Sequence, residues 1–317
     1  MNERASSNPE RIDLAVIVLN YRTPGMVVDC LASLDGQISA PNQRVVVVDN
    51  CSGDDSADRI EAAISEHGWG AWAEVVRSAT NGGFAAGNNV GIRHVDAACY
   101  LLLNSDTIVR EGAVETMMQT LEEHPGVSLL GPRLEWPDGQ PQISTFRYRT
   151  PISELLYGSG LGLLFRIFPK HEVARELHEW TAGIDWVSFA CVAIRREVVE
   201  SIGLLDEGYF MYFEDMDFCR RATGAGFEIA YQPGARVVHL QGESSGIVSG
   251  DKAHPRRPRY YYEARSWYLQ KYYGIIGRLV SNLLWTIGWV MLVARGKSAS
   301  ACRECFDIWI SRSGRSS

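Results

Sequence analysis

The chain has 317 residues, of which 46% are apolar and 22% are charged, with a formal net charge of −7. These proportions are typical of a globular protein and exclude a disordered, collagen-like or coiled-coil chain. The negative charge argues against a general nucleic-acid-binding protein, because such a protein needs a cationic surface, so we expect no nucleic-acid partner.

The charge is divided unevenly along the chain. From Asp251 onward the sequence contains 12 Lys and Arg against 4 Asp and Glu, so the preceding part is strongly acidic. A basic tail on an acidic body predicts an anionic partner for the tail, such as a phospholipid surface. Residues 1–11 are polar and lack the apolar segment of a signal peptide, so we expect a flexible N-terminus and a cytoplasmic protein.

Strands and helices are predicted to alternate in the first part of the chain. Apolar, β-branched runs indicate buried strands and segments of helical spacing indicate helices, with strands at 14–19, 44–48, 73–77 and 100–103 and helices at 26–34, 56–66, 87–95 and 111–123. This alternation predicts an α/β protein with a doubly wound sheet. Ligands of such sheets bind at the carboxyl ends of the strands.

The second part of the chain, residues 126–250, is less regular. We expect a hairpin at 136–139, strands at 186–194, 227–231 and 235–240, and helices at 196–202 and from the acidic cluster at 214–217 to Thr223. No internal repeat is found in the sequence. This part therefore extends the α/β fold without repeating the pattern of the first.

Residues 251–317 form a tail of different composition. The tail is aromatic and basic over 260–273 and apolar over 279–294, with Arg278 and Arg295 at the two ends of the apolar run. That run is shorter than the roughly 20 residues that span a bilayer. We expect an interfacial helix that contacts a membrane through 274–297, because Trp and flanking cations suit the headgroup layer. The alternative is a helix that packs on the body or in a homodimer contact.

Polar side chains follow three of the predicted strands. They are Asn20 with Tyr21, Asp49 with Asn50, and Asn104 with Ser105 and Asp106. A carboxylate such as Asp106, placed after a buried strand, suits Mg²⁺ or Mn²⁺, which take oxygen ligands and share them with substrate phosphates. The alternative is that Asp106 caps the helix that follows.

Two further features could contribute to a binding site. The glycine-rich loop at 81–89 opens a predicted helix, and free N–H groups at a helix N-terminus suit ribose and phosphate oxygens. His239, at the end of a predicted strand, is either a metal ligand or an ordinary buried histidine. Neither feature is specific on its own.

An acidic cluster lies beside large apolar residues. Glu214, Asp215 and Asp217 follow the apolar run 209–213. Mutual repulsion and partial burial raise the pKa of carboxyl groups, which is what a general base needs. The alternative is that these residues place favourable negative charge in the first turn of a helix.

Several common enzyme motifs are absent from the sequence. No G-x-G-x-x-G follows the first predicted strand, and no G-x-x-x-x-G-K-[ST] or G-x-S-x-G is present. These absences argue against a dinucleotide dehydrogenase, a P-loop NTPase and an α/β-hydrolase. Cys302 and Cys305 form a C-x-x-C without a second metal-ligand pair, and we interpret them as ordinary cysteines.

In their order along the chain, these segments resemble a bacterial glycosyltransferase of family 2 with the GT-A fold, over about residues 12–270. The resemblance is carried by 16–21, 47–50, 81–84 with 88–89, 102–107, 185–188 with 195–197, 203–207, 210–217 and 238–239. It implies a Rossmann-like mixed sheet flanked by helices over 12–250. The nucleotide-sugar half would be 12–125, the acceptor half 126–250, and the helical tail 251–317.

The resemblance also implies roles for individual residues. For the nucleotide-sugar, Asn20, Tyr21 and Asp49 would hold the base, and Asn81, Gly82, Gly83, Asn88 and Asn89 would line the ribose and diphosphate. Asn104 to Asp106 match the metal motif, so Asp106 would bind Mg²⁺ or Mn²⁺, with His239 completing the site. Asp215 matches the catalytic base, supported by Glu214. Trp186 and Asp217 would lie on the acceptor side.

The sequence departs from the family pattern at two positions. Asn104 stands where the metal motif usually begins with Asp, which would lower metal affinity. Phe189 stands where Gly is usual, and a bulky side chain there would reshape or close the acceptor side.

The activity implied by the resemblance is an inverting sugar transfer. Within the family the likeness is to the rhamnosyltransferase-like branch, which implies L-rhamnose from dTDP-rhamnose, a saccharide or polyprenyl-linked saccharide acceptor, and a place in cell-surface polysaccharide synthesis. We then expect a peripheral protein on the inner face of the plasma membrane. The alternatives are a UDP-sugar donor, such as UDP-galactofuranose or UDP-GlcNAc, and a non-catalytic nucleotide-sugar-binding scaffold.

Overall fold

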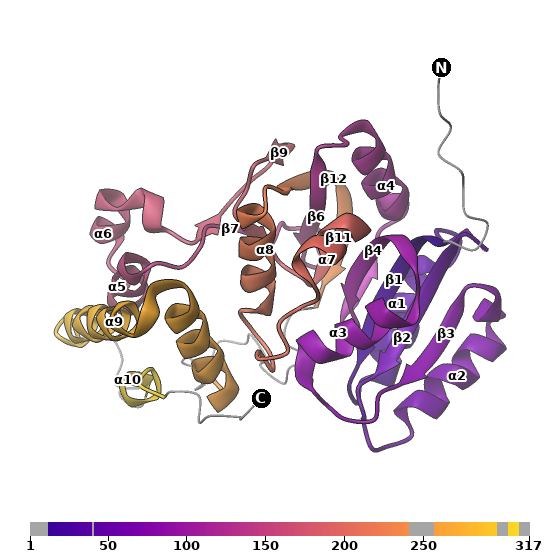
Figure 1. The fold of residues 1–317 in the computed structure, drawn as a ribbon, viewed down its shortest axis with the longest axis horizontal. Coiled ribbons are helices and arrows are strands. Elements are labelled where there is room, and N and C mark those ends of the chain that lie inside the picture. Colours follow the sequence, from indigo (N-terminus) through magenta and orange to yellow (C-terminus); the bar gives the residue numbers. More distant parts are fainter. Residues whose placement is uncertain (1–11, 40, 241–256, 297–303, 311–317) are drawn as a thin grey trace.

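The computed structural model describes residues 12–39, 41–240, 257–296 and 304–310 (Figure 1). Its main sheet has the strand order β3-β2-β1-β4-β11-β6-β12-β5, with β9 paired to the side of β12. The strands are β1 Ile12–Asn20, β2 Gln43–Asp49, β3 Ala73–Arg77, β4 Ala97–Asn104, β5 Thr107–Val109, β6 Val127–Glu135, β9 Thr181–Ala182, β11 Cys191–Arg195 and β12 Glu228–His239. The expected N-terminus, 1–11, lies outside the described residues.

The first four strands of this sheet are parallel and the rest are mixed. β1 pairs with β2 and β4 in parallel, and β2 pairs with β3 in parallel. β11 is antiparallel to both β4 and β6, β12 is parallel to β6, and β5 is antiparallel to β12. The predicted doubly wound sheet is therefore confirmed as a mixed sheet, and it runs without a break through both expected halves.

Helices cover both faces of the sheet. Side chains alternate along a strand, so Val45 and Val47 of β2 join one core cluster and Val46 and Val48 join the other. One face is packed against α1 Pro24–Leu34, α2 Ser56–Glu66 and α4 Ala113–Glu123. The other is packed against α3 Gly83–His94, α7 Arg196–Ile202 and α8 Glu214–Gly224. These buried layers hold the strand ends rigidly in place.

Two sequence-based boundaries were wrong. The predicted strand at 186–194 is divided between β11 and a separate strand, β10 Trp186–Val187, which belongs to a three-stranded sheet with β7 Thr145–Phe146 and β8 Ala174–Arg175. The two predicted strands at 227–231 and 235–240 are one strand, β12, whose register shifts between Gln232 and Arg236. The expected hairpin is present, because Gly139 donates its N–H to the carbonyl of Trp136.

The helical end of the molecule combines the tail with a segment from the middle of the chain (Figure 1). The helices there are α5 Pro151–Ser159, α6 Gly162–Ile167, α9 Arg259–Val293 and α10 Glu304–Asp307; short 3₁₀ helices occur at Trp69–Ala71 and Pro169–His171. α9 is broken at Gly274, where φ is 70° and ψ is −179°. α9 thus consists of two helical segments, 259–273 and 275–293.

α5 and the second segment of α9 cross closely because two glycines face each other. A Cβ on Gly158 would lie 2.4 Å from the carbonyl oxygen of Trp285, and one on Gly288 would lie 2.6 Å from that of Leu155. A buried ion pair joins α5 to the first segment of α9 as well, since the Arg265 guanidinium contacts Glu154 Oε2 at 2.7 Å. Both segments of α9 are therefore fixed to α5.

Most cysteines are part of the core. Cys30, Cys99, Cys191 and Cys219 are buried, and burial raises the pKa of the Cys30 and Cys99 thiols to about 12. Cys305 is partly buried and Cys302 lies outside the described residues. The interpretation of the C-x-x-C as an ordinary pair stays a prediction.

Candidate active site

The carboxyl ends of β1 and β2 are tied together by side chains. Asn20 Nδ2 donates to Asp49 Oδ1 at 2.7 Å and to Ser52 Oγ at 3.2 Å, and both Asn20 and Asp49 are buried. Arg22 and Cys51, directly after the strand ends, have positive φ values of 60° and 56°. Such backbone conformations cost about 1–3 kcal/mol and concentrate at functional sites.

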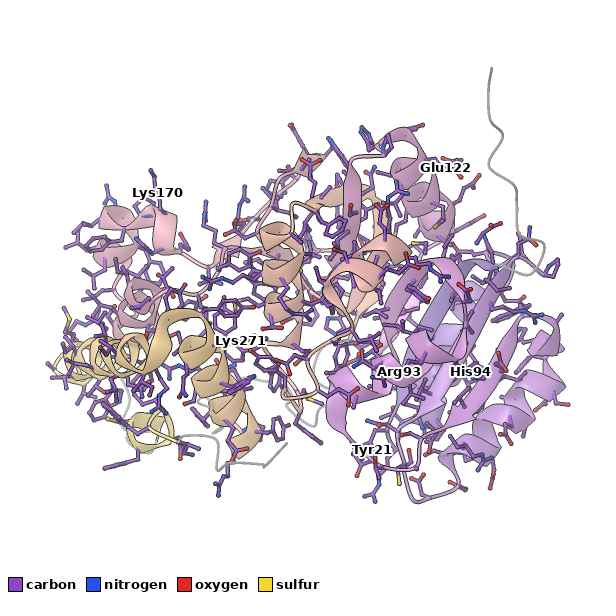
Figure 2. All side chains as sticks on the ribbon, in the orientation of Figure 1. Tyr21, Arg93, His94, Glu122, Lys170 and Lys271 are labelled. Carbon is purple, nitrogen blue, oxygen red and sulfur yellow. The ribbon has the colours of Figure 1, made fainter. Side chains whose placement is uncertain are left out.

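Tyr21 extends from the same edge of the sheet (Figure 2). Its side chain is 39% exposed, and the Arg22 guanidinium carbon lies 5.2 Å from its ring centre. An exposed aromatic ring beside a cation can stack on a planar base. The structure thus brings together Asn20, Tyr21 and Asp49, the three residues predicted to hold the base.

The glycine-rich loop is fastened to the segment that precedes the acidic cluster. Phe84 donates its N–H to the carbonyl oxygen of Phe210 at 2.7 Å, and Gly83 has φ of 87°. Asn50, directly after β2, is hydrogen-bonded to the loop: its Nδ2 donates to Asn81 Oδ1 at 3.0 Å and to the Gly83 carbonyl at 3.1 Å. The loop and the acidic cluster are therefore held in one arrangement.

We expect Gly83→Ala to disrupt this arrangement. A Cβ at Gly83 would lie 1.9 Å from the carbonyl oxygen of Phe210, so the two segments must separate. Together with the positive φ, this is expected to cost about 1–3 kcal/mol of stability and to weaken binding of a nucleoside diphosphate. Urea unfolding and calorimetric titration measure the two effects. Gly112→Ala is the matched control, because Gly112 also has positive φ but an added Cβ meets nothing within 4 Å.

Asp106 and His239, 133 residues apart in sequence, are brought together by the pairing of β5 with β12. His239 pairs with Thr107 in that register, and His239 Nε2 lies 3.6 Å from Asp106 Oδ1. The Asp106 carboxyl group is 1% exposed. Helix capping does not explain Asp106, because α4 begins only at Ala113 after an N-cap at Gly112.

These residues fit a divalent cation only in part. Among the described residues no group of three or more His, Cys, Asp or Glu gathers as a metal cluster. An Asp oxygen and a His nitrogen supply two ligands, and Mg²⁺ commonly takes the rest from water and substrate phosphates. Asn104 precedes Asp106, its side chain is partly buried, and it makes no side-chain hydrogen bond within the described residues. The pair therefore suits a cation that arrives with a diphosphate.

The acidic cluster opens α8 after two strained residues. Tyr212 and Phe213 have positive φ values of 72° and 70°. Glu214 is 5% exposed, and its buried Oε2 atom has no hydrogen-bond partner among the described residues. Asp215 accepts the N–H of Met216 at 2.7 Å. This turn places two adjacent carboxyl groups at the edge of the core.

Burial shifts both carboxyl groups toward the protonated form. Burial and the neighbouring charge of Asp215 hold the pKa of Glu214 well above its usual range. Burial raises the pKa of Asp215 to about 7, against opposing hydrogen bonds from the backbone. Asp215 can therefore accept and release a proton near neutral pH.

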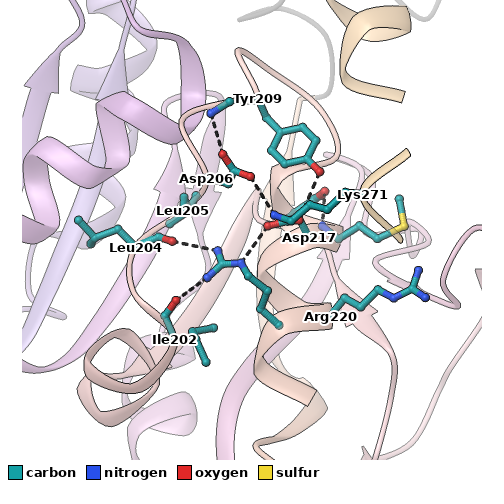
Figure 3. Close-up of polar contacts among 12 residues, drawn as sticks. Ile202, Leu204, Leu205, Asp206, Tyr209, Asp217, Arg220 and Lys271 are labelled. Atoms are coloured by element: carbon teal, nitrogen blue, oxygen red, sulfur yellow. Dashed lines mark hydrogen bonds and ion pairs between the residues drawn. The ribbon is translucent and has the colours of Figure 1, made fainter. Parts of the chain in front are cut away.

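Asp217, one turn further along, is fully buried at the centre of a polar network (Figure 3). Its Oδ1 contacts Lys271 Nζ at 2.6 Å and accepts the hydroxyl of Tyr272 at 2.8 Å, and its Oδ2 accepts from Arg221 at 2.9 Å. Lys271 also contacts Asp206 at 2.8 Å. The network joins α8 to the first segment of α9, and the acceptor role expected for Asp217 stays a prediction.

The remaining predicted site residues have structural partners. Asn89 exchanges hydrogen bonds with the backbone of Leu205 and donates to Glu207, and Asn88 donates to the Phe84 carbonyl within α3. Neither side chain therefore joins the group at the strand ends. Trp186 stacks on Phe146 with ring centres 4.1 Å apart and donates to the Arg147 carbonyl.

Phe189 does not lie in an open acceptor site. It is 2% exposed and contacts the ring of Phe218 edge-on, with ring centres 5.8 Å apart. Its side chain fills the core under α8, and its effect on the acceptor side stays a prediction.

Sequence reasoning missed three contributors to the site. The Ser52 hydroxyl donates to Asp49, and the Phe210 carbonyl accepts from the glycine-rich loop. Lys271, which belongs to the tail, contacts the carboxylates of Asp206 and Asp217. Ser52 lies two residues beyond a predicted strand-end pair, so its position was a usable signal. The Phe210 contact is made by the backbone, and Lys271 lies more than 50 residues from its partners. Neither contact therefore gives a signal that can be recognised in the sequence.

Comparison with known proteins gives the family. The family model described as "Glycosyltransferase like family 2" matches residues 9–254. One relative is the N-acetylglucosaminyl-diphospho-decaprenol L-rhamnosyltransferase of Mycobacterium tuberculosis. It is 27% identical over 151 residues, which cover 46% of this chain and 48% of the relative. The chain thus matches only about half the length of this relative.

Two further relatives match more of their length. The low-salt glycan biosynthesis hexosyltransferase Agl10 of Haloferax volcanii is 25% identical over 72% of this chain and 67% of the relative. The rhamnosyltransferase WbbL of Escherichia coli is 23% identical over 63% of this chain and 73% of the relative.

Solved structures confirm the GT-A-like fold. GalNAc-T7 has a TM-score of 0.58 at 15% identity, covering 94% of this chain and 58% of that one. The Pyrobaculum calidifontis mannosyltransferase PcManGT has a TM-score of 0.54 at 15% identity, covering 93% and 76%. Since the family model matches most of the sequence, the chain belongs to the family described as glycosyltransferase-like family 2.

Proposed function

We propose that the protein transfers a sugar from a nucleoside diphosphate to an acceptor hydroxyl, with inversion at the anomeric carbon. The observation that carries the proposal is Asp215, a partly buried carboxyl group with a pKa of about 7, on a turn fastened to the glycine-rich loop through Phe210. A base of this pKa is suited to removing the proton of a hydroxyl group near neutral pH.

The residues divide the work between the two substrates. Asn20, Tyr21 and Asp49 bind the base, and Asn81 with Gly82 and Gly83 orients the ribose and diphosphate. Asp106 and His239 would hold Mg²⁺ or Mn²⁺, which supplies positive charge where the leaving diphosphate becomes more negative.

Asp215 accepts the proton as the acceptor oxygen attacks the anomeric carbon and the bond to the diphosphate breaks. Burial and the charge of Asp215 hold the pKa of Glu214 well above its usual range, which favours a neutral side chain beside Asp215. Direct displacement by one activated hydroxyl inverts the anomeric centre.

The finer assignment is L-rhamnose from dTDP-rhamnose and a lipid-linked saccharide acceptor. It is supported by the M. tuberculosis and E. coli relatives, both of which are named as rhamnosyltransferases. A lipid-linked acceptor requires a protein at a membrane, here the inner face of the plasma membrane, and the apolar tail helix is compatible with that position. A homodimer stays a prediction.

The test is release of nucleoside diphosphate from a panel of donors, with Mg²⁺ or Mn²⁺ and with EDTA. Metal-dependent turnover of dTDP-rhamnose alone supports the full proposal. Turnover of UDP-galactofuranose or UDP-GlcNAc instead keeps the reaction and rejects the rhamnosyl donor. Absence of both turnover and donor binding would favour a non-catalytic scaffold.

We expect kcat/KM to fall on the acid side with an apparent pKa near 7. Asp215 acts in its ionised form, so activity rises as the pH rises through the pKa of about 7. The profile is measured from pH 5 to 9 with the cation saturating, while circular dichroism checks that the fold persists. A kcat/KM that stays level from pH 9 down to pH 5 would contradict a base with this pKa.

A further inference from the structure

The helical end of the molecule carries an extended apolar surface. In the second segment of α9 the exposed side chains are Ile275, Ile276, Leu279, Val280, Leu283, Ile287, Val290, Met291 and Val293. Their spacing of three and four residues places them on one face of the helix. Only 17% of the most apolar window of α9 is buried, so this face has no covering among the described residues.

α6 extends the surface although it lies about 100 residues earlier in the sequence. Leu163 and Ile167 are 63% and 56% exposed. The turn between α5 and α6 adjoins the end of α9, because Arg295 donates to the carbonyl of Ser159 and a Cβ on Gly160 would lie 3.6 Å from Leu292. The composition of the tail alone does not indicate this second contribution.

Within the two stretches of chain that carry these side chains, the charged residues have one sign. Residues 264–303 and 155–171 contain no Asp or Glu, whereas Arg166, Lys170, Arg278 and Arg295 lie among or beside the apolar side chains. Arg166 and Lys170 are exposed, and Lys170 lies at the outer end of the helical part (Figure 2). Cations next to exposed aliphatic side chains match the headgroups and acyl chains of an anionic bilayer.

We propose that α6 and the second segment of α9 together form one docking surface for an anionic phospholipid bilayer. The Gly158–Gly288 crossing and the buried pair of Arg265 with Glu154 fix α5 and α9 to each other, so the surface is already formed in the free protein. The role of this surface rests on the proposed function: it would hold the site beside a lipid-linked acceptor.

The experiment is flotation of the full chain with vesicles of phosphatidylcholine containing or lacking phosphatidylglycerol. We expect binding to the anionic vesicles and much weaker binding to the neutral ones. Leu163→Asp and Ile276→Asp should each lower binding about tenfold or more, since each replaces one aliphatic side chain that would be buried in the bilayer. Ile143→Asp is the matched control, because Ile143 is 49% exposed outside these helices and should leave binding unchanged.

Other outcomes overturn the proposal. If the intact chain does not float, or Leu163→Asp floats as the parent does, α6 is not part of a bilayer surface. If the protein is a dimer without vesicles and Ile276→Asp makes it monomeric, the face is an interface between two copies. Each variant is also tested for donor binding and for its circular dichroism spectrum. Intact donor binding with lost flotation separates this proposal from the proposed function.

Discussion

Asp215→Asn is expected to lower turnover by about 10²–10⁴-fold, the usual contribution of a general base, while donor affinity stays unchanged. The amide has the same size as the carboxylate, and its oxygen can still accept a hydrogen bond from the Met216 N–H. It cannot, however, accept a proton from the acceptor hydroxyl. Release of nucleoside diphosphate in the presence of acceptor measures turnover, and calorimetric titration measures donor affinity.

The same substitution is expected to stabilise the fold. Burial raises the pKa of Asp215 to about 7, so keeping this side chain ionised above that pH opposes folding. The neutral amide removes that cost, and the thermal midpoint at pH 8 should rise. The gain should shrink as the pH falls through 7, because the parent carboxyl then becomes neutral too.

Asp217→Asn is the matched control for this prediction. It makes the same chemical change two residues away, but Asp217 forms ion pairs with Lys271 and Arg221. We therefore expect its thermal midpoint to fall. If Asp215→Asn turned over as the parent does, the base would be another group, and if it also destabilised the fold, Asp215 would be a structural residue.

Glu154→Gln is expected to destabilise the protein by about 3–5 kcal/mol, the usual cost of leaving a buried charge without its partner. Glu154 is fully buried and lies against two guanidinium groups, at 2.7 Å from Arg265 and 3.1 Å from Arg149. The amide has no charge, so the 2%-exposed Arg265 side chain keeps hydrogen-bond acceptors, among them the Asn282 side chain and the Ile308 carbonyl, but loses its anionic partner. A lower urea midpoint measures the loss.

The control for Glu154 is a double-mutant cycle. Glu154→Leu combined with Arg265→Met removes both members of the closest pair, and a buried ion pair can often be replaced by apolar side chains with little loss. The double variant should therefore be more stable than either single variant. Equal stability of Glu154→Gln and the parent would show that the pair does not hold α5 to α9.

The main sheet was predictable where local pattern decides the structure. β1, β2 and β4 are continuous apolar runs, which in a short segment indicate a strand buried on both faces. The division of 186–194 was not predictable in this way, because Ser188 to Ala190 turn the chain between two sheets while remaining as apolar as a strand.

The site was predictable only at the level of single motifs. The sequence singled out Asp106 and His239 separately, but only the antiparallel pairing of β5 with β12 places them 3.6 Å apart. Asn89 looked like part of the glycine-rich loop, yet its partners Leu205 and Glu207 are more than 110 residues away. Contacts across such separations depend on the assembled fold, which local sequence does not describe.

The break at Gly274 has a consequence for orientation. Lys271 and Tyr272, just before it, hold the first segment of α9 to the helix that carries Asp215, while the residues just after it begin the apolar face. An uninterrupted helix through this point would turn the same apolar side chains in a different direction relative to Asp215. The positive φ of a single glycine therefore sets the angle between the helix that carries Asp215 and the apolar face of the tail.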